Sequence, residues 1–281
     1  MHTFVNNVKT ALLMGGLIGL MAAVGAAIGP GYIVPMLVVG LVMNIGAWFF
    51  SDTIAIKAMR GRELDASTGG DLYRTVQELS QRAGLPMPKV YLCPHAAPNA
   101  FATGRSPRKA AVAFTQGAME LMDRDEIAGV VAHELAHIKN RDTLTSCIAA
   151  TIAGVLAMLS HWGFLLMMGD RRHGANPLVM IVVFMVAAVG AALIKAAISR
   201  SREFVADADA AAIVGSPEGL ISALRKLEGY SKRIPLEQPN PAQNNLFIIE
   251  PFNADTAAKL FATHPPTAKR IAALQRLQPG A

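Results

Sequence analysis

Long apolar segments, nearly free of charge, alternate with polar segments along the chain. Two come early, at residues 11–28 and 33–50, with only Gly-Pro-Gly-Tyr between them, and two more lie at residues 143–168 and 176–199. Each has about 18 residues or more, enough for a helix to cross the hydrocarbon core of a bilayer. Gly-Pro-Gly is typical of a tight turn. The pattern predicts four transmembrane helices. We disfavour a cleaved signal peptide for the first segment, because a second apolar segment follows at once.

Basic residues are distributed unequally around these segments. Only Arg171 and Arg172, beside Asp170, lie at the ends that four spans would place on the far side of the membrane. The near side carries Lys9, Lys57, Arg60, Arg62, Lys139, Arg141, Arg200 and Arg202. Because Lys and Arg concentrate on the cytoplasmic side of membrane proteins, both termini are predicted to be cytoplasmic, including a short N-terminal segment at residues 1–10.

The polar remainder forms two blocks, residues 51–142 and 200–281, and we expect both in the cytoplasm. In the first block, Leu72, Val76 and Leu79 have helical spacing. The segments "PKVYLCP", "NAFATG" and "AAVAFTQG" are short strand candidates. A further helix is expected to begin after Asp123 or Asp125, since either is a suitable N-cap, and to continue into the third span.

The second block is predicted to be helical over most of its length. "SREFVADADAAAIVG" continues the fourth span and stops at Gly215, "SPEGLISALRKLEGY" forms another helix, and "HPPTAKRIAALQRL" begins with prolines and forms a last amphipathic helix. Neither block is expected to form a stable domain by itself, so we expect the two blocks to pack into one domain. The predicted fold is a mainly α membrane protein with four transmembrane helices and a cytoplasmic α+β zincin-like domain around a small β-sheet.

Composition agrees with a membrane protein. Hydrophobic residues make up 52% of the 281 residues and charged residues only 16%, whereas soluble domains have about 25% charged residues. We attribute the net charge of +6 to the basic residues that flank the spans, since no nucleic-acid-binding motif is present. Cys93 and Cys147 are the only cysteines, and their spacing suggests neither a disulfide framework nor a CxxC site.

The motif HExxH stands at the end of the first polar block, as His133, Glu134 and His137. On a helix, residues i and i+4 lie about 40° apart around the axis and about 6 Å along it, so both imidazoles can reach one Zn²⁺. Glu134 lies beside the metal rather than facing it, which suits a general base acting on a water that the metal holds.

A catalytic zinc needs a third protein ligand and an open position. Asp142 lies five residues after His137 and is expected to face away from it on a continuing helix. Glu203 lies shortly after the fourth span, and His137 lies shortly before the third. If these two spans form an antiparallel helix pair, the two residues come together near the membrane surface. Asp207 and His264 are the other candidates. Glu203 and Asp207 are spaced i, i+4, so one can bind zinc while the other orients a ligating histidine.

Three segments, "HELAHIKNRD", "SREFVADADA" and "THPPTAKRI", resemble in this order the HtpX membrane zinc peptidases, relatives of the CAAX prenyl endopeptidase. The resemblance extends to the paired spans and covers nearly the whole chain. It implies a gluzincin-type metalloendopeptidase with one Zn²⁺ per chain. It also implies that Glu203 is the third ligand and that Asp207 supports the ligands from behind without binding the metal itself.

The same resemblance implies roles for residues away from the metal. His264 would help to stabilise the oxyanion, together with Arg270. "PNAFATG" resembles the segment whose edge strand binds the substrate main chain, which places Asn99 and Ala100 along the cleft. The implied setting is the bacterial cytoplasmic membrane, with a cytoplasmic active site that cleaves misfolded membrane proteins during stress.

Three other interpretations agree less well with the sequence. A CAAX-like processing peptidase needs more spans to enclose its chamber. An intramembrane protease would place HExxH inside a span, whereas Lys139, Arg141 and Asp142 directly follow it here. A non-catalytic membrane scaffold that keeps zinc structurally would not need Glu134. The lipid bilayer is the expected environment, and "GLIGLMAAVG" in the first span would also permit self-association, although small residues serve hairpin packing equally well.

Overall fold

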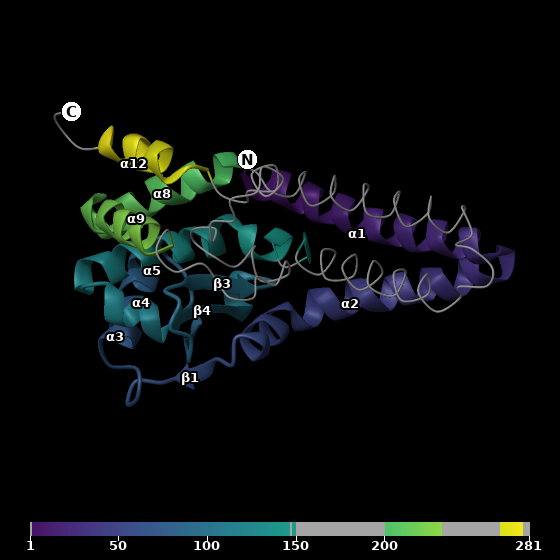
Figure 1. Cartoon of the computed structure of the whole chain (residues 1–281), viewed down its shortest axis with the longest axis horizontal. Helices are drawn as coiled ribbons and strands as arrows, with labels where there is room; N and C mark the ends of the chain where they lie inside the picture. Colours follow the sequence, from purple (N-terminus) through teal and green to yellow (C-terminus); the bar gives the residue numbers. More distant parts are fainter. Residues whose placement is uncertain (1, 147, 150–199, 232–264, 278–281) are drawn as a thin grey trace, which may run out of the picture.

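A helical hairpin projects from a rounder α+β domain in the computed structural model (Figure 1). The structure describes residues 2–146, 148–149, 200–231 and 265–277. The fourth predicted span, most of the third, and His264 lie outside the described residues.

The hairpin consists of two long helices joined by a tight turn. Helix α1 spans His2–Ile28, the 3₁₀ turn η1 spans Pro30–Tyr32, and helix α2 spans Ile33–Ala58. Gly29 has a φ of +154°, which favours glycine over residues with a side chain. The apolar stretches cover Phe4–Ala26 in α1 and Pro30–Phe50, which includes η1 and most of α2. Two of the four predicted spans are therefore present as helices long and apolar enough to cross a membrane.

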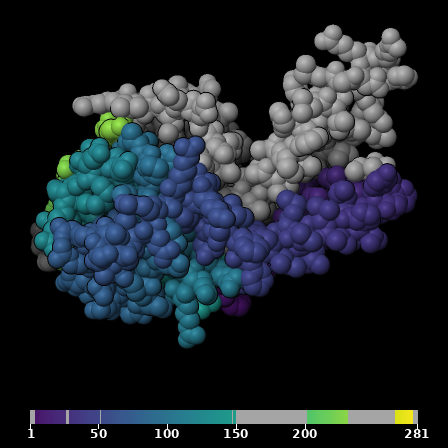
Figure 2. All heavy atoms as spheres, turned by 90° about the horizontal axis from the view of Figure 1, so that it is seen from below, coloured from purple at the N-terminus to yellow at the C-terminus, as the bar shows by residue number. Residues whose placement is uncertain are grey.

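The surface of the hairpin supports contact with lipid. Apart from Met87 and Leu277, every exposed large hydrophobic side chain among the described residues lies within residues 4–54. Figure 2 shows the same hairpin as a narrow arm in purple and violet beside the bulkier domain. So large an apolar surface is unusual on a soluble protein and marks a membrane or protein contact.

Polar contacts occur inside the hairpin as well. The buried Asn44 of α2 donates a hydrogen bond of 2.9 Å from Nδ2 to the main-chain oxygen of Met14 in α1. Leu144 and Ile148, at the start of the third predicted span, belong to the same buried cluster as Leu13 and Leu17 of α1. The chain that follows the HExxH motif therefore packs along the first helix.

The domain contains a four-stranded sheet of order β1-β2-β4-β3. The strands are β1 (Arg62–Leu64), β2 (Lys89–Cys93), β3 (Ala100–Gly104) and β4 (Ala110–Thr115). Strands β2 and β4 are parallel, and the two outer strands are antiparallel to their neighbours. Three of the strands were predicted. Strand β1 was not predicted, because three residues are too few for an alternating pattern to be recognised.

Six helices among the described residues complete the domain. They are α3 (Gly70–Arg82), α4 (Gln116–Leu121), α5 (Arg124–Asn140), α8 (Arg200–Val214), α9 (Glu218–Ser231) and α12 (Thr267–Gln275). One buried cluster joins residues such as Val112 and Leu135 to Leu224 and Leu274. The two polar blocks of the sequence thus share one hydrophobic core.

Helix α5 lies at the centre of this core and contacts β3, β4, α3, α8 and α9. Its approach to α9 depends on two glycines. A Cβ at Gly129 would lie 2.5 Å from the main-chain nitrogen of Leu220, and a Cβ at Gly219 would lie 2.2 Å from the oxygen of Asp125. The backbones of α5 and α9 are therefore closer at these two positions than a residue with a side chain would allow. This close packing fixes the position of α5 in the domain.

Candidate active site

The start of α5 is fixed by a capping box, in which Asp123 and Glu126 each accept a hydrogen bond from the other's main-chain nitrogen, at 3.0 and 2.9 Å. Glu126 is buried and also accepts hydrogen bonds from Ser222 and Lys226 of α9. Of the two predicted N-cap residues, Asp123 and Asp125, the structure shows Asp123 in this position. The HExxH residues thus lie on a helix whose first turn is fixed by its capping box and by hydrogen bonds to α9.

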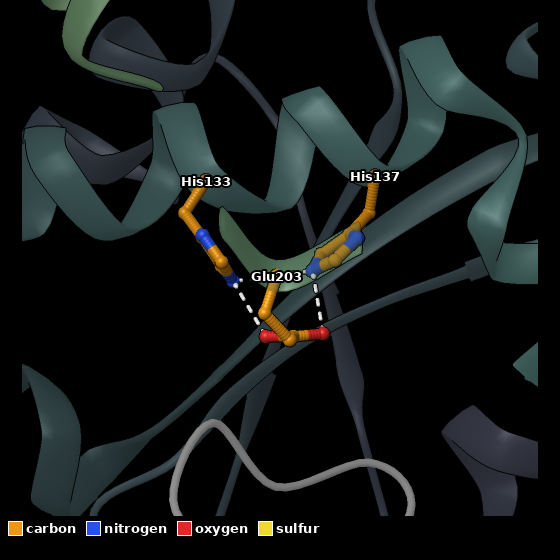
Figure 3. Close-up of side chains that lie close together, drawn as sticks. All are labelled: His133, His137 and Glu203. Atoms are coloured by element: carbon orange, nitrogen blue, oxygen red, sulfur yellow. Dashed lines mark hydrogen bonds and ion pairs between the residues drawn. The ribbon is translucent and has the colours of Figure 1, made fainter. Parts of the chain in front are cut away.

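Three side chains converge next to α5. His133 and His137 point from one face of the helix with their Nε2 atoms 3.1 Å apart, and Glu203 reaches them from α8 (Figure 3). The Glu203 carboxylate oxygens lie 3.7 Å from Nε2 of His133 and 3.6 Å from Nε2 of His137. Each of the three residues offers one ligand atom, and these atoms all lie within 4.8 Å of one another. This set can hold a single metal ion.

The electrostatics of the cluster favour a cation. Burial opposes protonation of His137, but the negative charges of Glu203 and Asp142 outweigh burial and raise the pKa of the imidazole to about 9. Positive charge at this position is therefore stabilised, and a divalent cation supplies more of it than a proton does. Two imidazoles and one carboxylate are also a donor set that catalytic zinc uses.

Asp207 orients the first of the two histidines. Its Oδ1 lies 3.0 Å from Nδ1 of His133, which leaves Nε2 of that ring directed at the cluster. Arg270 of α12 donates to both carboxylate oxygens of Asp207, at 2.9 and 2.6 Å. Burial raises the pKa of Asp207, but the Arg270 guanidinium lowers it further, to about 2. The Asp207 carboxylate is therefore ionised and fixed.

Asp142 orients the second histidine, His137. The expectation that Asp142 faces away from His137 was therefore wrong. Its Oδ2 lies 3.0 Å from Nδ1 of His137. The expectation assumed one continuous helix, whereas α5 ends at Asn140 and Arg141 is left-handed, with φ 58° and ψ 32°. That single residue turns the chain back before helical structure resumes at Asp142.

The remaining predicted residues are placed as follows. Glu134 lies on α5 between the two histidines and is 4% exposed. The main-chain oxygen of Asn99 accepts a hydrogen bond from the main-chain nitrogen of Thr115, and the main-chain nitrogen of Asn99 donates to Oγ1 of Thr115. Ala100 begins β3, opposite Phe114 of β4. Asn99 and Ala100 are both buried, in a segment next to α5. Arg270, predicted to assist the oxyanion, is 1% exposed and paired with Asp207.

Sequence reasoning missed two residues of the site. One is Asp142 as a partner of His137. The other is Asn6 of α1, whose Nδ2 donates to Oδ1 of Asp142 at 2.5 Å. A single polar residue shortly before an apolar segment, as Asn6 is, forms no recognisable sequence pattern. Only the position of Asp142 at the end of HELAHIKNRD could have signalled a role.

A comparison with protein-family models matches residues 66–278 to "Peptidase family M48". The chain belongs to peptidase family M48. Proteins named "Protease HtpX homolog" are similar over nearly the whole length of this M48 chain. The one from Desulforapulum autotrophicum is 44% identical over 96% of this chain and 89% of its own. The one from Pyrococcus furiosus is 42% identical over 96% of this chain and 95% of its own. The predicted resemblance is confirmed, and the protein is a membrane metalloendopeptidase.

A solved structure gives the same fold at lower identity. The S. mikatae Ste24p crystal structure matches with a TM-score of 0.53 and 20% identity, over 96% of this chain. The match covers 64% of the Ste24p chain, so the M48 protein described here spans less than two thirds of it. At this identity the likeness concerns the fold alone.

Proposed function

We propose that this M48 peptidase is a zinc-dependent endopeptidase of the bacterial cytoplasmic membrane that cleaves misfolded or damaged membrane proteins at their cytoplasmic loops. The observation that carries the proposal is the convergence of His133, His137 and Glu203 on one point, next to the start of a membrane helix. A peptidase site in that position meets loops and exposed ends of other membrane proteins as they leave the bilayer.

The residues present fit zinc. His133, His137 and Glu203 supply two nitrogens and a carboxylate, all nearly buried, and both rings are held from their far sides by carboxylates. Zinc usually has such support from residues behind its ligands. When bound, a zinc ion would polarise the scissile carbonyl and increase the acidity of a water molecule.

Glu134 is proposed as the general base and acid. It follows His133 directly on α5, and its carboxylate is shielded from bulk solvent at 4% exposure. In that position it takes a proton from the attacking water and passes the proton to the leaving amine of the cleaved peptide bond. Such proton transfers contribute about 10²- to 10⁴-fold to rates.

Arg270 and His264 are proposed to divide two roles that the sequence analysis gave to them jointly. The guanidinium of Arg270 makes two short hydrogen bonds to Asp207 and lies 3.9 Å from Oε2 of Glu203 through Nη1. This favours a role in holding the carboxylates around the metal site and, through Asp207, His133. The stabilisation of negative charge on the substrate oxygen then falls to His264, which precedes α12 by three residues.

The substrate main chain is proposed to bind along β3. Among the described residues, β3 pairs with β4 on one edge and has no strand on the other, and the same strand contacts α5. An extended peptide can add to such an edge through main-chain hydrogen bonds. Asn99 and Ala100, at the beginning of β3, would lie along this peptide. Recognition of the main chain rather than of particular side chains suits a protease that removes damaged proteins.

The proposal is tested with the full-length wild type and Glu134→Gln, both purified in detergent. Zinc content and cleavage of an unfolded casein-like substrate are measured in parallel. We expect about one zinc per chain in both proteins, and at least a hundredfold slower cleavage by the variant, in line with the roughly 10²- to 10⁴-fold contribution of a general base. Wild-type cleavage should stop on chelation. If both proteins bind zinc and neither cleaves, a structural zinc site in a membrane scaffold replaces the proposal.

A further inference from the structure

The two ligating histidines are supported in the same way. Each has its Nδ1 atom 3.0 Å from the carboxylate of a buried aspartate, Asp207 for His133 and Asp142 for His137. Each aspartate is held in turn from behind by a second side chain. For Asp207 that side chain is Arg270 of the C-terminal helix α12. For Asp142 it is Asn6, near the beginning of the first membrane helix.

The side-chain amide of Asn6 contacts the residues on both sides of the turn that ends α5. Its side chain is 7% exposed and donates two hydrogen bonds from Nδ2, one to Oδ1 of Asp142 and one of 3.0 Å to the main-chain oxygen of Asn140. These acceptors lie on either side of Arg141, the left-handed residue that turns the chain. One amide group thus fixes both the end of α5 and the carboxylate that contacts His137.

Asp142 needs this partner because it is buried, at 2% exposure. A buried ionised carboxylate without hydrogen-bond donors is strongly unfavourable. Its Oδ2 lies against His137 and its Oδ1 accepts from Asn6. Without the amide, the carboxylate would turn toward the small cavity beside it, which Lys9 and Arg202 also line. Such a rotation would remove the support of His137.

Helix α1 is held in register with these residues by a second polar contact. Oγ1 of Thr10, one turn after Asn6, lies 2.9 Å from Oγ1 of Thr145. Figure 1 shows the N-terminal end of α1 beside α8, the helix that carries Glu203. The first turns of α1 therefore belong to the scaffold of the site as much as to the membrane.

We infer that Asn6 is a positioning residue of the metal site: it holds Asp142, Asp142 orients His137, and the metal affinity therefore depends on the first membrane helix. The inference rests on the proposed metal site and adds a part of the chain that lies outside the region matched to the family model. A shift of α1 within the bilayer would change the geometry of His137 through two hydrogen bonds.

The test measures the zinc dissociation constant of the full-length protein in detergent, by competition with a chelator. Asn6→Leu keeps the approximate size of the side chain and removes the donor. Asn7→Leu, on the exposed side of the same turn, is the matched control. Thermal unfolding of the zinc-free proteins shows that each variant is folded.

We expect Asn6→Leu to weaken zinc binding about tenfold, the lower end of the roughly 10- to 100-fold effect of residues behind metal ligands. Asn7→Leu should stay within about twofold of the wild type, because Asn7 is exposed and is not in the chain of contacts. In a protein that already carries Asp142→Ala, Asn6→Leu should add less than about twofold, since non-additivity identifies residues that act through one another.

Two results would overturn the inference. One is equal zinc affinity of Asn6→Leu and Asn7→Leu. The other is an undiminished effect of Asn6→Leu in the Asp142→Ala background, which would mean that Asn6 acts through helix packing. Failure of the proposed protease function is seen separately, as a wild type that binds zinc and cleaves nothing, and the binding measurements remain decisive in that case.

Discussion

The pairing of Arg270 with Asp207 lends itself to a quantitative test of how the site is held. Both side chains are 1% exposed, and the guanidinium makes two hydrogen bonds of 2.9 and 2.6 Å to the carboxylate. Lowering the pKa of Asp207 from 3.8 to about 2 corresponds to roughly 2–3 kcal/mol in favour of the charged form. Removal of one partner of a buried ion pair costs more, about 3–5 kcal/mol, because an uncompensated charge stays behind.

Arg270→Leu is the perturbation, and Lys269→Leu is its control, because Lys269 is the neighbouring cation on the exposed side of α12. Thermal unfolding of the zinc-free proteins in detergent should show a midpoint lower by about 10 °C for Arg270→Leu, at about 2–4 °C per kcal/mol for a domain of this size. Lys269→Leu should change the midpoint by no more than about 2 °C, as surface substitutions rarely exceed about 0.5 kcal/mol.

Zinc affinity gives a second readout of the same change. With Asp207 no longer held, His133 loses its fixed orientation, and the dissociation constant should rise by about 10- to 100-fold. The reasoning is refuted if Arg270→Leu unfolds within about 2 °C of the wild type and binds zinc equally well. In that case Arg270 would be free to serve the oxyanion, the role first expected of it.

Three further predictions concern the metal, the helix packing and the buried thiol. Glu203→Ala should lose zinc, whereas Glu134→Gln should keep it, which metal analysis after dialysis will show. Gly129→Ala should lower the thermal midpoint, because its Cβ would meet the main chain of α9. Gly229→Ala, with nothing within 4 Å of its Cβ, should raise stability by about 0.5–1 kcal/mol. Burial raises the pKa of the Cys93 thiol to about 11, so iodoacetamide at pH 8 should label it only after unfolding, as peptide mass spectrometry can establish.

Each of these has a contrary result. Zinc retained by Glu203→Ala would move the third ligand elsewhere. Equal stability of Gly129→Ala and Gly229→Ala would mean that α5 and α9 can separate without cost. Labelling of Cys93 in the folded protein at the rate of an unfolded peptide would show that β2 opens readily.

Local patterns in the sequence determined most of the elements of this protein. Apolar segments gave the first two membrane helices, although α1 begins at His2 and includes residues expected to precede it. Helical spacing gave α3, and the left-handed Gly215 marks the end of α8 as predicted. HExxH predicted that His133 and His137 lie on one face of a helix, as they do, since residues spaced i, i+4 on a helix lie on the same face. These features depend on neighbours within a few residues, which the order of amino acids specifies directly.

Tertiary structure decided which side chains surround the ligands. Spacing alone left Glu203, Asp207 and His264 open as third ligands, and only the family resemblance pointed to Glu203. The packing of α8 on α5 brings Glu203 to the two histidines. Asp142 was misjudged because Arg141, rather than the glycine or asparagine usual at such a position, takes the left-handed conformation that ends α5.

Asn6 lies more than a hundred residues from Asp142 in the sequence, and no local pattern connects the two. Their hydrogen bond exists because α1 packs along the chain after HExxH, where Leu13 and Leu17 meet Leu144 and Ile148. Hydrophobic burial is non-directional, so the apolar pattern predicts that such helices pack and leaves open which residues come into register. The register, and with it the support of His137, is set by the shapes and polar contacts of the folded protein.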